Sequence, residues 1–171
     1  MDKLKKGCIL FDWGDTLMRV LPEYHGPMKD WPRVEAVPGA AEMLAALHQE
    51  RTLALATNAA DSDEQDIRAA LRRADLERWL DHIYCFKKIG FRKPSPEFFA
   101  YILEDLGLPA EQVIMVGDDY MADVLGARQC GLRAVWFKQG TWKGFDWGEV
   151  GIRSSVSNPQ STGAGKKRIL P

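Results

Sequence analysis

The segment Gly7-Cys8-Ile9-Leu10-Phe11-Asp12 is a short apolar run that ends in an acid. The runs Thr52–Thr57 (Thr-Leu-Ala-Leu-Ala-Thr) and Val113–Val116 have the same form, and polar residues follow both of them. Short apolar runs bounded by polar residues are typical of buried strands. We therefore predict strands here, each with polar side chains at its carboxyl end.

Helix signals separate these runs. Apolar residues at helical spacing, capping residues and terminal glycines predict four helices: Pro38–Glu50, a helix capped by Ser62 and Gln65, a helix from Ser95–Pro96 to Gly107, and Met121–Cys130. Two further apolar runs, His82–Phe86 and Ala134–Phe137, are predicted as strands. Strands that alternate with helices indicate an α/β fold, a parallel sheet with helices on both faces. Such sheets bind ligands at the carboxyl ends of their strands.

The composition excludes several classes of protein. The 23 Lys and Arg residues against 24 Asp and Glu residues give a net charge of −1, so no large field attracts a polyanion and no nucleic-acid partner is expected. The run Cys8–Phe11 is too short for a signal peptide. Because no apolar stretch approaches the roughly 20 residues that span a bilayer, no membrane partner is expected either.

The cysteines indicate the cellular compartment. Cys8, Cys85 and Cys130 are odd in number, widely separated and form no CxxC pair. This pattern argues against a disulfide scaffold and against a zinc module. It suggests a reducing compartment, and we expect a cytoplasmic protein.

The chain has 171 residues, which suffice for only one domain. Its charge and composition nevertheless change near the C-terminus. Residues 139–171 carry a net charge of +3, which leaves −4 for the rest, and Ser154–Gly165 almost lacks large apolar residues. Such a segment cannot bury enough surface to offset its ordering entropy. We predict a domain over residues 1–140 and a Gly/Ser-rich basic tail over residues 141–171 that is largely disordered. Trp142 and Trp147 either fold back onto the domain or mark a contact surface.

Three carboxylates would meet if the first and fourth strands are neighbours: Asp12, Asp118 and Asp123. They would repel one another unless a cation intervened, and a few oxygen ligands suit Mg²⁺, which completes its octahedron with substrate phosphate and water. Lys93 offers a second positive group and Thr57 a hydroxyl. These groups are the parts needed to form an aspartyl-phosphate, although a generic acidic cleft is the alternative.

The same residues resemble a known family. Four ordered segments are similar to the four motifs of the haloacid dehalogenase-like (HAD) hydrolases: Phe11-Asp12-Trp13-Gly14-Asp15-Thr16-Leu17, Thr57-Asn58, Lys93-Pro94-Ser95-Pro96, and Gly117-Asp118-Asp119 with Asp123. The resemblance spans Cys8 to about Phe137. With it, the predicted fold is a three-layer, Rossmann-like parallel sheet of about five strands in the order 3-2-1-4-5, with no sizeable cap domain.

The resemblance implies a role for each residue on the substrate side of the site. Asp12 is the nucleophile, and Thr57 holds the transferring phosphoryl group. Lys93 neutralises charge between the nucleophile and the phosphate. Thr57, Asn58 and Lys93 together bind the substrate.

The resemblance also implies a magnesium site. Asp12, Asp118 and the main-chain carbonyl of Gly14 are the expected Mg²⁺ ligands. Asp123 is either a further ligand or a residue that orients metal-bound water.

The chain departs from the family at Gly14, because most phosphatases of the family have an aspartate there as general acid and base. Asp15 follows directly. Either Asp15 or water replaces the missing acid, or Asp15 only stabilises the turn, which is the interpretation we favour. We expect the enzyme to be slow on alkyl phosphates.

The gaps between the motifs are short. Only Leu17–Ala36 separates the first motif from the next helix, and the gap before Lys93 already holds a helix and a strand. We therefore expect an open site that accepts a small-molecule or an exposed macromolecular phosphate ester, with the substrate, a partner or a neighbouring chain as its cover. Tyr24, His25 and Trp31 either set specificity or pack the loop down.

Two alternatives to a phosphatase remain. The first is a catalytically weak phosphate-binding or interaction module on the same fold. The second is a HAD hydrolase that acts on another bond, since dehalogenases and phosphonate-cleaving relatives also lack the acid replaced by Gly14. Asp118 and Asp123 argue against the metal-independent dehalogenases, and the missing cap argues against phosphonate cleavage.

Overall fold

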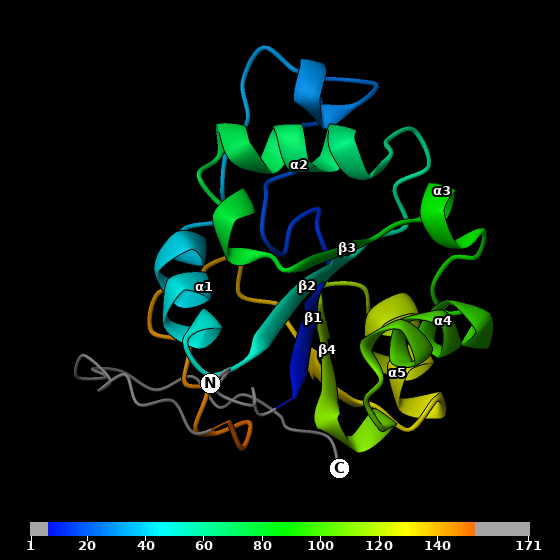
Figure 1. The fold of residues 1–171 in the computed structure, drawn as a ribbon. Helices are drawn as coiled ribbons and strands as arrows, with labels where there is room; N and C mark the ends of the chain where they lie inside the picture. The colour runs from blue at the N-terminus through cyan, green and yellow to red at the C-terminus, as the bar shows by residue number, and fades with distance from the viewer. Residues whose placement is uncertain (1–6, 153–171) are drawn as a thin grey trace.

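The computed structural model describes residues 7–152, which form a five-stranded parallel sheet (Figure 1). The strands are β1 (Cys8–Phe11), β2 (Thr52–Ala56), β3 (His82–Tyr84), β4 (Val113–Gly117) and β5 (Arg133–Trp136). Their order in the sheet is β3-β2-β1-β4-β5. The predicted strand order and the α/β class are confirmed.

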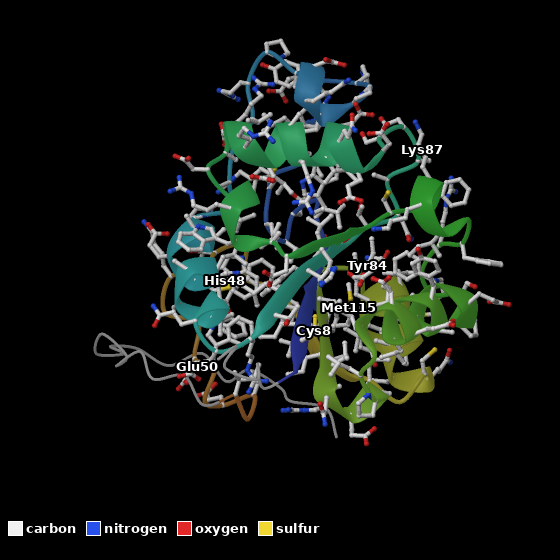
Figure 2. All side chains as sticks on the ribbon, in the orientation of Figure 1. Cys8, His48, Glu50, Tyr84, Lys87 and Met115 are labelled. Atoms are coloured by element: carbon white, nitrogen blue, oxygen red, sulfur yellow. The ribbon has the colours of Figure 1, made fainter. Side chains whose placement is uncertain are left out.

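The strands have two apolar faces, and each is covered by a layer of helices. The helices are α1 (Ala40–His48), α2 (Glu64–Arg73), α3 (Phe86–Ile89), α4 (Pro96–Leu106) and α5 (Gly126–Gln129). Along β1, Ile9 and Phe11 belong to the core that α1 and α2 cover, while Cys8 and Leu10 belong to the core that α4 and α5 cover. Figure 2 shows the second face, where Cys8, Tyr84 and Met115 lie toward α4 and α5. This alternation produces the predicted three layers.

Shorter helical turns connect the main elements. Three are 3-10 helices, at Met28–Asp30, Glu77–Trp79 and Ala110–Gln112, and Tyr120–Leu125 is a π-helical segment that leads directly into α5. No helix within residues 7–152 is both long enough and apolar enough to cross a bilayer.

The start of α2 differs from the prediction by one residue. The observed capping box pairs Asp63 with Asp66: each side chain accepts a hydrogen bond from the other residue's backbone N–H, at 2.9 and 3.1 Å. The predicted cap Ser62 is instead buried, and its hydroxyl donates to Asp61. Adjacent residues both offered a cap, and the carboxylate accepts the stronger hydrogen bond.

The segment from Leu17 to Ala36 packs onto α2 and contains a single 3-10 turn (Figure 1). The rings of Tyr24 and Trp31 lie 5.8 Å apart, and the Trp31 indole donates to the carbonyl of Gly26. Arg73 of α2 donates to the carbonyls of Lys29 and Trp31 at 2.8 and 2.7 Å. The packing interpretation therefore holds for Tyr24 and Trp31, while His25 is exposed.

The prediction that the domain ends at residue 140 is wrong, because residues 141–152 complete the core. Trp142, Phe145 and Ile152 are 4%, 9% and 1% exposed. The Trp142 ring stacks on Phe137 at 4.0 Å and meets Phe11 edge-on at 5.9 Å. Figure 1 shows this segment in orange beside α1. The prediction failed because it rested on the average composition of the tail, which is rich in glycine and serine. A few large apolar side chains bury enough area to order residues 141–152 in spite of that average. The remainder of the predicted tail, residues 153–171, lies outside the described residues.

Candidate active site

The site forms at the carboxyl edge of the sheet, where three neighbouring strands end. Phe11 of β1 is in register with Leu55 of β2 and with Val116 of β4. The next residue, Asp12, donates its backbone N–H to the carbonyl of Val116 at 2.8 Å. The polar residues that follow these strands are therefore brought to one place, as the sequence predicts.

Asp12, Asp118 and Asp123 lie close together, and Lys93 contacts two of them, Asp12 and Asp123. One oxygen from each carboxylate lies within 4.8 Å of the other two. The Lys93 Nζ, in a side chain only 2% exposed, donates to Asp12 Oδ1 at 2.9 Å and to Asp123 Oδ1 at 2.6 Å. The four residues form one cluster of three carboxylates and one ammonium group.

The cluster carries more negative charge than Lys93 balances. Partial burial, contact with Asp12 and the charge of Asp123 raise the pKa of Asp118 to about 7. Burial and the charge of Asp12 outweigh the opposite effect of Lys93 and raise the pKa of Asp123 to about 6. For Lys93, burial lowers the pKa, but two carboxylates more than compensate and raise it above its usual value. A divalent cation would relieve the repulsion that remains between the carboxylates, and three oxygen donors fit such an ion.

Lys93 is held in position by Asn58. The Asn58 side chain accepts the Lys93 backbone N–H at 2.8 Å and donates to the Lys93 carbonyl at 2.9 Å. The Lys93–Pro94 peptide bond is cis. Both polar atoms of the Asn58 side chain therefore position Lys93. A contact between Asn58 and substrate stays a prediction.

Asp123 is fixed by a close approach of the backbone. It lies in the π-helical segment Tyr120–Leu125, and its Oδ2 accepts the backbone N–H of Asp119 at 3.1 Å. A β-carbon on Gly117 would collide with Asp123 Oδ2, so only glycine fits at the end of β4. Because one Asp123 oxygen meets Lys93 and the other meets a backbone amide, this carboxylate is the most constrained of the three.

Thr57 lies at the end of β2, where the sequence predicts it, and is 4% exposed. Its backbone N–H donates to the carbonyl of Tyr84 at 3.0 Å, and its Oγ1 accepts the N–H of Ala59 at 3.1 Å. These bonds fix the hydroxyl at the same sheet edge as Asp12.

The residues after Asp12 form a tight turn. Asp15 has a positive φ of 56°, and its Oδ1 accepts the backbone N–H of Val20 at 2.9 Å. This geometry agrees with the turn-stabilising interpretation of Asp15. A β-carbon on Gly14 would lie 2.8 Å from Val20 Cγ2, so Val20 occupies the space next to position 14.

Three residues of the site were not identified from the sequence. The buried Thr16 places its hydroxyl 3.5 Å from Asp118 Oδ1 and accepts the indole N–H of Trp142 on its carbonyl at 2.7 Å. The Trp136 indole donates to the carbonyl of Asp118 at 3.0 Å. The position of Trp136 at the end of β5, on the same edge, is the one signal that could have revealed it.

An open cavity of about 410 Å³ adjoins Asp118. Its walls come from the turn after β1 and from the chain that leaves β5. The lining residues are Asp15, Arg19, Val37, Asp118, Trp136, Phe137, Lys138 and Gly140.

A family model described as haloacid dehalogenase-like hydrolase matches residues 15–131. The phospholysine phosphohistidine inorganic pyrophosphate phosphatase of Rattus norvegicus is 51% identical over 51 residues, which cover 30% of this chain and 19% of that protein. The pyrimidine 5′-nucleotidase YjjG of Escherichia coli (strain K12) is 32% identical over 101 residues, 58% of this chain and 44% of that protein. The chain thus spans less than half the length of either relative.

A solved structure extends the similarity over most of the fold. The crystal structure of an uncharacterized protein from Listeria monocytogenes serotype 4b superposes with a TM-score of 0.70 at 28% sequence identity. The superposition covers 77% of this chain and 78% of that protein.

Proposed function

The chain belongs to the haloacid dehalogenase-like hydrolase family, and on that premise we propose that it hydrolyses phosphate monoesters through a phosphoryl group carried on Asp12. The observation that carries the proposal is the contact of Lys93 Nζ with both Asp12 and Asp123 at one end of the sheet. The names of the rat and Escherichia coli relatives, a phosphatase and a nucleotidase, support the same reaction class.

In the first step, a carboxylate oxygen of Asp12 attacks the phosphorus of the ester. The bond between phosphorus and the leaving oxygen breaks, the leaving group departs with the bonding electron pair and takes a proton from solvent, and the phosphoryl group becomes an acyl phosphate on Asp12. Lys93 stays charged because two carboxylates raise its pKa, so its ammonium group stabilises the negative charge that gathers between nucleophile and phosphate. Thr57 donates its hydroxyl to a phosphoryl oxygen.

In the second step, water attacks the acyl phosphate. The Asp12 carboxylate is regenerated and inorganic phosphate is released. The proton that water loses ends on the phosphate or in solvent. Asn58 contributes by holding the Lys93 main chain through both steps.

We propose Mg²⁺ as the cofactor, held by Asp12, Asp118, Asp123 and the main-chain carbonyl of Gly14. The raised pKa values of Asp118 and Asp123 support this assignment, because they indicate negative charge that a cation would neutralise. When bound, Mg²⁺ supplies positive charge that lowers the repulsion between the nucleophile and the phosphate.

The substrate is a small-molecule or an exposed macromolecular phosphate ester, and its leaving group must depart without the usual acid. Glycine stands at position 14, and the Asp15 side chain is engaged by Val20. Turnover of alkyl phosphates is therefore slow. The reducing cytoplasm is the proposed location, because Cys8, Cys85 and Cys130 are odd in number, widely separated and form no CxxC pair.

The test is a panel of aryl and alkyl phosphate esters assayed with and without Mg²⁺. Asp12→Asn should abolish turnover of every ester while the folded structure remains, because the amide is nearly isosteric but a poor nucleophile. Asp75→Asn is the matched control, since Asp75 is exposed and pairs with Arg78 on the surface. Retained turnover in Asp12→Asn would exclude the covalent route.

A second candidate, a phosphate-binding module without significant turnover, is favoured by one observation, the missing carboxylate at Gly14. The same panel separates the two functions. A protein that binds inorganic phosphate in the presence of Mg²⁺ yet cleaves no ester would be such a module.

A further inference from the structure

The cavity beside Asp118 carries two cationic side chains from different parts of the chain. Arg19 follows the turn after β1, and Lys138 follows β5. The turn that brings Arg19 to the cavity begins at Asp12, and the Trp136 indole ties the end of β5 to the carbonyl of Asp118. The two cations therefore lie next to the carboxylate cluster.

Neither cation is neutralised by a strong ion pair. Within residues 7–152, no carboxylate lies within ion-pair distance of Lys138, whose Nζ sits 3.6 Å from the centroid of the Trp136 ring. Arg19 has a long contact of 3.9 Å with Glu35, and both side chains are exposed to solvent. A long, solvated pair contributes little, so Arg19 is available to an anion. Lys138 keeps its full positive charge over the Trp136 ring and can also attract one.

The acids on the cavity wall are already engaged. Asp15 accepts the backbone N–H of Val20, and Asp118 belongs to the carboxylate cluster. Position 14, where the resembled phosphatases have a carboxylate, is glycine here and adds no negative charge to this part of the site. The charge of the cavity therefore favours an anion once the proposed Mg²⁺ neutralises the carboxylate cluster.

Building on the proposed function, we infer that this cavity recognises a second anionic group, carried by the leaving part of the phosphate ester. Arg19 and Lys138 are the residues that set this specificity. The group is a carboxylate or a second phosphate, since guanidinium and ammonium groups bind both. A recognised anion would also hold the leaving group in place in this open site.

The test compares three aryl phosphates that differ only in the para substituent of the leaving phenol. The substituents are a carboxylate, its methyl ester and a phosphonomethyl group. The phosphonomethyl group mimics a second phosphate but cannot be hydrolysed as an ester. We expect kcat/KM for at least one anionic substrate to exceed that of the methyl ester by about tenfold, mainly through KM. The preferred anion then distinguishes carboxylate from phosphate.

Arg19→Gln and Lys138→Gln should each remove most of this preference and leave the methyl ester rate unchanged. Arg72→Gln is the control for net charge, because Arg72 is an exposed cation of α2 that does not line the cavity. If Arg72→Gln lost the preference for the anionic esters to the same extent, the preference would come from the net charge of the protein and not from this cavity, and the inference would be overturned.

The outcomes separate this inference from the proposed function. Equal kcat/KM for all three esters overturns the inference alone. Failure of the unmodified protein to cleave any of them overturns the proposed function, and the inference with it.

Discussion

The indole Nε1 of Trp142 donates a 2.7 Å hydrogen bond to the carbonyl oxygen of Thr16, across 126 positions of sequence. Thr16 is fully buried and lies in the turn that follows Asp12. The backbone N–H of Trp142 also donates to the carbonyl of Pro38 at 2.7 Å. A residue beyond β5 therefore holds the turn that follows Asp12, the proposed nucleophile.

Trp142→Phe should destabilise the protein by about 1–3 kcal/mol, because a buried carbonyl oxygen loses its only indole donor. The smaller phenyl ring also loses some packing, so a control with the same change of ring size is needed to isolate the hydrogen bond. Denaturant unfolding measures the change, and turnover should fall because the turn after Asp12 loosens. Trp147→Phe is the matched control, since it makes the same change of ring size. Trp147 stacks on the Trp142 ring, but the hydrogen bond to Thr16 comes from Trp142. Equal losses in the two variants would contradict the role given to the bond.

Gly14→Asp should accelerate alkyl phosphates selectively, by up to about 10²-fold, because a general acid helps most when the leaving alkoxide is basic. The new β-carbon would lie 2.8 Å from Val20 Cγ2, so Val20→Ala is introduced together with it. The measurement is the ratio of kcat/KM for an aryl and an alkyl ester. Val20→Ala alone is the control.

An unmodified protein that already cleaves an alkyl ester at ordinary enzymatic rates would contradict this prediction. Another group would then be the acid. Asp15→Asn is the next variant to assay in that case, because Asp15 is adjacent and lines the cavity.

Mg²⁺ should raise the melting temperature by about 5–10 °C at a concentration of about 100 Kd, since a ligand that binds only the folded state stabilises it by mass action. Asp118→Ala should remove this shift. Glu111→Gln, at an exposed position outside the carboxylate cluster, should keep it. The same shift in Asp118→Ala would place the metal elsewhere.

The metal-free protein should lose stability as the pH rises from about 4 to 7. The folded state raises the pKa of Asp118 to about 7 and that of Asp123 to about 6, so folding favours their protonated forms. That contribution is complete below the pKa of an unfolded aspartate and disappears above the folded values. Asp118→Asn should therefore raise the metal-free melting temperature at alkaline pH. Because Asp118 is solvent-exposed, screening reduces the gain to about 1 kcal/mol, which corresponds to about 2–4 °C. An unchanged pH profile in this variant would contradict the assignment.

The fold was predictable because its central strands have a strong local signal. β1, β2 and β4 are buried apolar runs, and each appears within one residue of its predicted bounds. β3 is shorter than predicted, because Phe86 already begins α3, and one turn of helix is too short to show a period. At α2 the prediction chose Ser62 and not the adjacent Asp63 as the cap, because both residues can cap a helix and the sequence alone does not rank them.

The site was predictable only in part. Four ordered motifs pointed to Asp12, Lys93, Asp118 and Asp123, which the structure brings together. Their roles in catalysis stay predictions. The contact between Trp142 and Thr16 could not be found, because nothing near either residue encodes a partner so distant in sequence. The predicted tail over residues 141–171 included Trp142, and packing of this residue onto the domain was only one of two alternatives.

The position of Trp142 has a consequence for the order in which the protein is made. During synthesis β1 and its turn leave the ribosome first, and domains fold as units once their parts are present. The donor for the Thr16 carbonyl emerges 126 residues later, and β4, the neighbour of β1, also comes late. Pairings this distant close slowly. A nascent chain that already carries Asp12, the proposed nucleophile, therefore lacks the donor to the Thr16 carbonyl until residue 142 has emerged, and a chain that terminated before residue 142 would lack this hydrogen bond altogether.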